Sequence, residues 1–147
     1  MNNLLVIPIG IVFVFIVVLI HHEVLMFVTQ WLLLRFSRPR RWHVAATVLI
    51  LIGAHVTEII VYGVGLYWVG ETWHFGSLLG DGIPTIQTYL YFSFASYTSL
   101  GIGDIFPIGH IRLLTGIEAL LGLLMIGWTA SFLFLEMRSI WSVESNN

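Results

Sequence analysis

The chain has 147 residues, of which 58% are hydrophobic and only 10% are charged, and its formal net charge is −2. Soluble domains carry about 25% charged residues, so this composition excludes a soluble globular domain and indicates a single-domain integral membrane protein. The chain contains no cysteine, which excludes a disulfide framework, and its charge balance gives no sign of a nucleic-acid partner.

The first apolar segment predicts a peripheral transmembrane helix over residues 1–36. Its apolar run extends from Leu4 to Leu34 and is broken only by HHE and TQ. At 1.5 Å per residue the run would measure roughly 45 Å, whereas a hydrocarbon core is about 30 Å thick, so the helix must tilt or begin outside the core. A signal peptide is the alternative, but no basic residue precedes the run and no small-residue cleavage site follows it.

Residues 37–43 are predicted to be a basic loop. The stretch RFSRPRRWH holds Arg35, Arg38, Arg40 and Arg41, which are four of the six basic residues. The positive-inside rule places such a loop in the cytoplasm, so the N-terminus is expected outside. Three spans then leave the C-terminus, which follows Arg138, in the cytoplasm. We expect a multi-pass protein of the plasma membrane, and its small size suits a prokaryote.

The rest of the chain predicts two more spanning helices with a short helix between them. An outer helix is predicted over 44–69, with the interfacial aromatics Trp42, Tyr67 and Trp68 at its two ends, and a Gly-rich extracellular loop follows it. Pro84 suits the first turn of a helix over 84–97. That helix would be only about 20 Å long, too short to cross a bilayer, so we expect a re-entrant segment. An inner helix over 111–138 and a short cytoplasmic tail over 139–147 complete the chain.

The stretch SYTSLGIGDIFP, residues 96–107, predicts an extended segment after the short helix. Backbone that is not helical survives at membrane depth only where it is buried in protein or lines water. Alternating glycines allow successive carbonyls to point to one side, and carbonyls from several subunits can replace the hydration shell of an ion. The negative end of the preceding helix dipole favours a cation there. A cation filter is therefore predicted, with an ordinary Gly-rich turn as the alternative.

Residues 98–104, which read TSLGIGD and are followed by Pro107, resemble the TTVGYGD filter of tetrameric potassium channels. The resemblance covers about residues 45–137 and implies an all-α membrane protein that assembles as a homotetramer. It implies a pore domain over 44–138, with outer helix 44–69, pore helix 84–97, filter 98–104 and inner helix 111–138. The N-terminal helix is additional to this two-helix module.

The resemblance also implies roles for particular residues. K⁺ would bind at Ser99, Leu100, Gly101, Ile102 and Gly103, and Thr98 would begin the filter. Tyr91 and Asp104 would support the filter from behind by a hydrogen bond. Glu118 would brace the pore helix through a hydroxyl such as that of Ser96 or Thr98. The inner helix would carry a hinge at Gly122 and line the cavity and gate with Leu123, Ile126, Ala130 and Phe134.

The expected function is passive, K⁺-selective conduction by a homotetramer among membrane lipids, with K⁺ as the permeant ligand and no cofactor. Ile102 stands where the family has tyrosine, so a weakly selective monovalent cation channel is an alternative. A non-conducting regulatory subunit of a larger channel is another. An intramembrane aspartyl protease also uses GxGD, but it needs two aspartates on neighbouring spans. Besides Asp104 the chain has only Asp81, in a loop, so we do not expect an enzyme.

Two groups of ionisable residues fall within predicted spans. They are His21, His22 and Glu23 in the first span, and His55 and Glu58 in the second. Ionisable side chains at such depth are costly and usually pair or serve a function. Three interpretations remain open: a buried polar network between the helices, a pH sensor based on histidine titration, and a metal site.

Overall fold

The structure is a computed structural model that describes residues 3–33, 41–80 and 82–144. Its helices are α1 (Asn3–Phe27), α2 (Arg41–Tyr67), α3 (Ile86–Tyr97) and α4 (Ile111–Glu144). One π-helical segment, Val28–Leu33, extends α1, and a second, Trp68–Thr72, extends α2. Two short strands, β1 (Gly76–Leu79) and β2 (Phe106–Gly109), flank α3 in the sequence.

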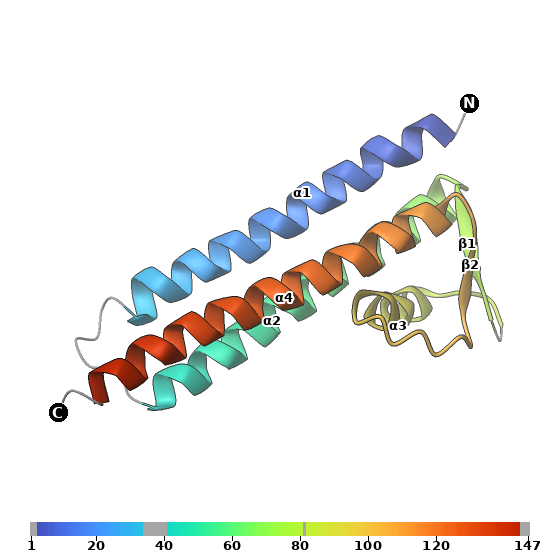
Figure 1. Cartoon of the computed structure of the whole chain (residues 1–147). Helices are drawn as coiled ribbons and strands as arrows, with labels where there is room; N and C mark the ends of the chain where they lie inside the picture. Colours follow the sequence, from blue (N-terminus) through green and yellow to red (C-terminus); the bar gives the residue numbers. More distant parts are fainter. Residues whose placement is uncertain (1–2, 34–40, 81, 145–147) are drawn as a thin grey trace.

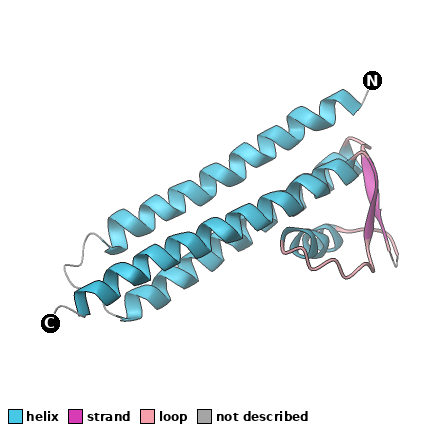
Figure 2. Cartoon of the chain, viewed as in Figure 1, coloured by secondary structure: helices cyan, strands magenta, loops and turns pink. Residues whose placement is uncertain are grey.

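The three long helices lie side by side, and α2 runs opposite to α1 and α4 (Figure 1). Each contains an apolar segment long enough to cross a membrane, namely Leu5–Gln30, Trp42–Thr72 and Ile111–Arg138. The predicted all-α membrane protein with three spanning helices is therefore confirmed. The short helix α3 and both strands lie at the end of the bundle near the N-terminus (Figure 2).

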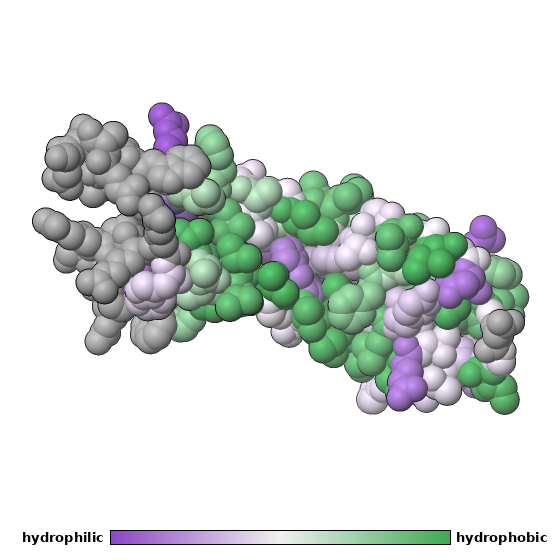
Figure 3. Space-filling model, turned by 90° about the horizontal axis from the view of Figure 1, so that it is seen from below, coloured by the Kyte–Doolittle hydropathy of each residue, from purple (hydrophilic) through white to green (hydrophobic). Residues whose placement is uncertain are grey.

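Large apolar side chains cover the outside of the bundle, as expected for helices that face lipid. Leu49 is 69% exposed and Phe15 is 66% exposed. Hydrophobic residues also cover most of the described surface in Figure 3. In water such a surface would be unfavourable, whereas in a bilayer it contacts hydrocarbon tails.

Glycines allow α1 and α3 to pack closely against the other helices. A Cβ atom at Gly65 of α2 would lie 2.3 Å from the ring of Phe13 in α1, and one at Gly63 would lie 3.1 Å from the Cα of Leu90 in α3. Gly10 of α1 lies similarly close to Ile117 of α4. Small residues at such contacts let helix backbones approach each other inside membranes. The N-terminal helix is thus packed against both α2 and α4.

The N-terminus of α3 is fixed by a capping box. The side chain of Thr85 accepts a hydrogen bond from the backbone N–H of Thr88, and the hydroxyl of Thr88 accepts one from the backbone N–H of Thr85. These two bonds satisfy backbone donors that have no partner within the helix. The helix consequently begins at Ile86, two residues after the predicted start at Pro84, and ends at Tyr97 as predicted.

The two strands were not predicted. They pair antiparallel, with Gly76 opposite Gly109 and Leu79 opposite Phe106. Gly109 has a φ of +72°, and a Cβ atom there would lie 2.8 Å from the Cα of Gly76, so only glycine fits this close approach. The strands join the segment before α3 to the segment after the predicted filter, and α3 and the filter lie between them along the chain.

Several predicted boundaries need correction. α4 continues to Glu144, so most of the predicted tail over 139–147 is helical. α2 begins at Arg41, which moves 41–43 from the predicted basic loop into a helix. The remainder of that loop, residues 37–40, lies outside the described residues. The N-terminal helix is described from Asn3 to Leu33, including its π-helical end, within the predicted range 1–36.

Candidate functional site

The predicted filter leaves the C-terminus of α3 as an extended segment with an unusual backbone. Ser99, Gly101 and Gly103 have φ angles of +56°, +56° and +86°. Leu100 and Ile102 between them do not have positive φ. A strand with φ of one sign directs successive carbonyls to opposite sides. Where the sign of φ alternates from one residue to the next, successive carbonyls point to the same side. Glycine adopts the positive φ that this requires without steric cost.

The first amides of this segment are held by the end of α3. The N–H groups of Leu100 and Gly101 donate to the carbonyl of Ala95, at 2.9 and 3.5 Å, and the N–H of Ser99 donates to that of Ser96. Within the described part of the chain, no hydrogen bond between backbone groups has a carbonyl of residues 99–103 as its acceptor. Thr98 through Asp104 are all exposed in a single protomer. These carbonyl oxygens are thus free to contact a ligand.

The outer end of the segment is tied to α3 by two side chains. The hydroxyl of Tyr91 donates a hydrogen bond to Asp104 Oδ2, at 3.0 Å, across 13 residues of sequence. This is the contact expected from the resemblance. The hydrogen bond to the carboxylate favours the protonated phenol and so raises the pKa of Tyr91 above its usual value.

Glu118 of α4 braces α3 through the hydroxyl of Ser93, and the hydroxyl of Ser96, one of the two expected partners, also interacts with its carboxylate. Its carboxylate is fully buried and accepts a hydrogen bond from Ser93, whose single hydroxyl hydrogen is shared with the carbonyl of Ile59 at 3.0 Å. The hydroxyl of Ser96 donates to the carbonyl of Thr115, and that of Thr98 donates to Phe94 within its own helix. Ser93 thus links α3 to both α2 and α4.

A second support for α3 was missed by the sequence analysis. The hydroxyl of Tyr89 donates to Glu71 Oε1 at 2.8 Å, and Ser77 of β1 donates to the same oxygen at 3.0 Å. Burial and the bond to Glu71 raise the pKa of Tyr89 to about 12. Gly70 beside them leaves room for the phenol, because a Cβ atom there would lie 2.7 Å from its oxygen. The first turns of α3 are thereby joined to the end of α2 and to β1.

The predicted hinge and cavity residues all lie on α4. A Cβ atom at Gly122 would lie 2.1 Å from the carbonyl oxygen of Tyr97, so this glycine allows α4 to contact the last turn of α3. The predicted cavity-lining residues are exposed in a single protomer; they are Leu123, Ile126, Ala130 and Phe134. Their exposure leaves them available to line a shared cavity, and their roles remain predictions.

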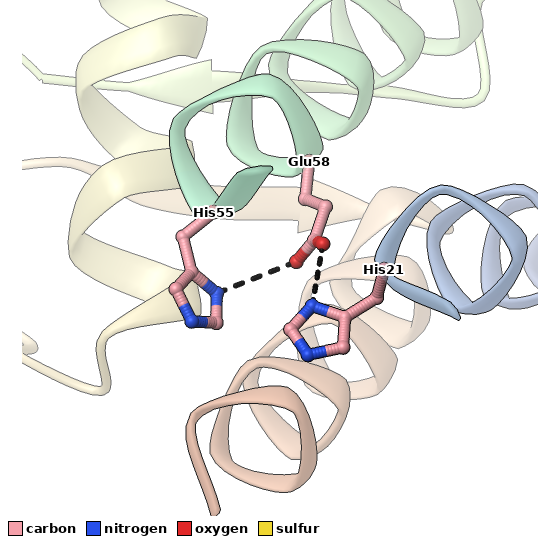
Figure 4. A group of neighbouring side chains, drawn as sticks. All are labelled: His21, His55 and Glu58. Atoms are coloured by element: carbon pink, nitrogen blue, oxygen red, sulfur yellow. Dashed lines mark hydrogen bonds and ion pairs between the residues drawn. The ribbon is translucent and has the colours of Figure 1, made fainter. Parts of the chain in front are cut away.

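Three of the five predicted ionisable residues come together where α1, α2 and α4 meet. His21 Nδ1 lies 2.9 Å from Glu58 Oε1, and His55 Nδ1 lies 3.5 Å from Glu58 Oε2 (Figure 4). His22 and Glu23 do not join them. Their side chains are 49% and 76% exposed and lie 3.6 Å from each other. The predicted network therefore needs correction on α1, where only His21 belongs to it.

Two hydroxyl residues that the sequence analysis did not assign to this cluster complete it. Tyr97, the last residue of α3, donates a hydrogen bond to Glu58 Oε2 and lies 2.8 Å from His55 Nδ1. Thr129 of α4 lies 3.0 Å from His55 Nε2 and 3.3 Å from His21 Nε2. The only available signal was that Thr129 is a hydroxyl residue in the middle of an apolar span. The cluster connects all four helices next to the start of the filter segment.

Asp104 is the only aspartate among the described residues, so no second aspartate is seen beside it. Its carboxylate contacts Tyr91, and the other aspartate that a protease would need, Asp81, lies outside the described residues.

Comparison with known proteins identifies the part of the chain that holds these features. A family model described as an ion channel matches residues 42–138, which span α2, α3, the extended segment over 98–104 and most of α4. The searches of curated proteins and of solved structures each gave no significant match. A model that covers about two thirds of the chain, together with three spanning helices and the extended segment, identifies the family: the chain belongs to this ion-channel family.

Proposed function

We propose that the chain is one subunit of a homotetrameric channel that conducts K⁺ passively through the carbonyls of residues 99–103. The observation that carries this proposal is the alternation of φ along the segment, where Ser99, Gly101 and Gly103 are left-handed and the residues between them are not. This backbone presents in series carbonyls that accept no backbone hydrogen bond from the described residues, and a dehydrated cation requires such free oxygens.

Assembly of several copies is part of the proposal, because one strand cannot surround an ion. Several strands around an axis would replace a hydration shell by rings of carbonyls. The exposure of residues 98–104 in the protomer is compatible with this, since these residues would meet their copies only in the assembly. The C-terminal end of α3 lies immediately before the segment, so its dipole adds negative potential there.

Selectivity for K⁺ over Na⁺ depends on how firmly the segment is held. Asp104 is tethered to Tyr91, and α3 is anchored through Ser93 to Glu118. The side chain of Ile102 offers no polar atom for a further tether and is 55% exposed in the protomer. This feature favours a second candidate function, a monovalent cation channel of weak selectivity.

Flux into liposomes that contain the purified chain tests the proposal. We expect K⁺ uptake that exceeds Na⁺ uptake and is blocked by Ba²⁺. Gly101→Ala should reduce the flux, because alanine is disfavoured at φ +56° although no atom lies within 4 Å of its Cβ position.

Gly53→Ala is the matched control for this variant. Gly53 also has no neighbouring atom at its Cβ position, but it lies in α2 without positive φ. Equal K⁺ and Na⁺ flux would support the weakly selective channel instead. Absence of flux from properly folded protein would contradict both and favour a regulatory subunit.

A further inference from the structure

The buried cluster of His21, His55 and Glu58 has the geometry of a cation site. One ligand atom from each residue lies within 4.8 Å of the other two. Figure 4 shows the carboxylate of Glu58 between the two imidazole rings, with both Nδ1 atoms directed at it. His21 and Glu58 are fully buried, while the side chain of His55 remains 17% exposed and leaves a route to the surface.

One hydroxyl, that of Thr129, contacts the Nε2 atoms of both imidazole rings, on the side away from Glu58. Thr129 Oγ1 lies 3.3 Å from His21 Nε2 and 3.0 Å from His55 Nε2. Histidine metal ligands usually hold their second nitrogen by a hydrogen bond of this kind, which fixes the tautomer and the ring orientation. A hydroxyl oxygen has two lone pairs, so it can accept from both Nε2–H groups at once.

Without an additional proton or a bound cation, the hydrogen bonds of this cluster cannot all form. Five contacts close a ring through the two histidines, Thr129, Tyr97 and Glu58. Each contact needs one hydrogen. The two hydroxyls and two neutral imidazoles provide one each, and an ionised carboxylate provides none, so one contact lacks a hydrogen. An unsatisfied buried polar atom is unfavourable, and the cluster therefore needs an additional positive charge.

A bound cation removes this deficit. Both Nδ1 lone pairs and Glu58 would face the cation, both rings would carry hydrogen on Nε2, and Thr129 would accept both bonds. Tyr97 would still donate to the second oxygen of Glu58. Both nitrogens of each ring and both carboxylate oxygens then have a partner, and the charge of the carboxylate is compensated within the membrane.

We propose that His21 Nδ1, His55 Nδ1 and the Glu58 carboxylate bind a divalent transition cation of the Zn²⁺ class. Two imidazoles and a carboxylate are a recognised ligand set for Zn²⁺, which leaves its fourth position to another ligand. Tetrahedral ligand atoms would lie roughly 3.4 Å apart, so ring movements of roughly an ångström complete the site. Imidazole nitrogen disfavours K⁺, Mg²⁺ and Ca²⁺, which prefer oxygen.

The site gives the N-terminal helix a role that the family match does not cover. His21 lies in α1, outside residues 42–138, whereas His55 and Glu58 lie in α2. The cation would thus clamp α1 to the pore module. Tyr97 and Thr129 connect the clamp to α3 and α4, beside the close contact of Gly122 with the Tyr97 carbonyl.

Direct cation binding tests this proposal without any measurement of conduction. The full chain, purified in detergent and freed of metal with a chelator, is titrated with Zn²⁺ against a chromophoric competitor. We expect one tight site per chain. Co²⁺ in the same site should give the visible absorption of a tetrahedral complex with nitrogen and oxygen ligands.

Variants assign the site to these residues. Glu58→Gln and His55→Asn should each weaken Zn²⁺ binding by more than tenfold and abolish the Co²⁺ absorption. Thr129→Val, which removes the shared hydroxyl, should weaken it by about tenfold. His22→Ala, which changes the exposed histidine next to His21, should bind as the wild type does.

Three results would overturn the proposal. The first is no stoichiometric Zn²⁺ binding by the wild-type chain, which would make the cluster a network completed by a proton. The second is an equal loss of binding in His22→Ala. The third is full binding by Glu58→Gln. Circular dichroism and size-exclusion chromatography identify any misfolded variant, and His55→Asn and Thr129→Val provide independent tests if Glu58→Gln fails to fold.

Discussion

Gly122 of the inner helix lies against the carbonyl oxygen of Tyr97, the last residue of α3, so closely that a Cβ atom would come within 2.1 Å of it. The contact joins α4 to the helix end from which the filter segment emerges. From the family resemblance, Gly122 is expected to be a hinge. In the structure, the lack of a side chain at Gly122 also allows α4 to pack closely against α3.

Gly122→Ala should therefore destabilise the protein. The new methyl group meets backbone, which cannot rotate away as a side chain can, so α3 or α4 must shift. Overpacking of this kind costs about 1–3 kcal/mol. Thermal unfolding in detergent should show a lower midpoint. Gly127→Ala on the same helix is the control, because nothing lies within 4 Å of its Cβ position, and an equal loss there would refute the packing explanation.

Ser93→Ala should also destabilise the protein, by leaving the buried carboxyl group of Glu118 without this hydroxyl. Loss of a hydrogen bond to a buried carboxyl group costs about 1–3 kcal/mol. Glu118→Gln should cost less, because its amide oxygen still accepts the bond from Ser93. Unfolding of both single variants and of the double variant measures the coupling. Strictly additive effects would show that the two side chains do not interact.

The pair of Tyr91 and Asp104 predicts a dependence on alkaline pH. The hydrogen bond raises the pKa of Tyr91 in the folded protein, so its contribution is complete below the usual tyrosine pKa and is lost as pH rises through the higher folded value. The tyrosinate absorbance of Tyr91 is identified by its loss in Tyr91→Phe. This absorbance should appear at lower pH in Asp104→Asn than in the wild type. An unchanged titration in Asp104→Asn would contradict the contact.

Much of the fold could be predicted from the sequence because long apolar runs have few alternatives in a membrane. The three spans were identified in this way, whereas the helix over 84–97, whose end at Tyr97 is confirmed, was predicted from Pro84 in its first turn. The hydrogen bond between Tyr91 and Asp104 followed from the spacing of the family motif. The β1–β2 pair could not be predicted, because it consists of strands of four residues, and Gly76 and Gly109 resemble loop residues in sequence.

The details of the candidate sites depended on which way each helix faces. Neighbouring residues on a helix point about 100° apart, so His21 faces inward while His22 and Glu23 face outward. The same geometry brings Ser93, which was not expected, to Glu118 beside Ser96, whereas Thr98 bonds within its own helix. Tyr97 and Thr129 join the histidine cluster only through the packing of α3 and α4 against α2, which no local pattern reveals.

The most direct test of the central claim, that the carbonyls of residues 99–103 form a K⁺ filter, is the reversal potential of the purified chain in a planar bilayer with K⁺ on one side and Na⁺ on the other. The account predicts a reversal potential far from zero, with the sign that K⁺ permeation sets. It also predicts that Gly101→Ala reduces that current, whereas Gly53→Ala does not. A current that reverses at zero, or one that Gly101→Ala leaves unchanged, would contradict the account.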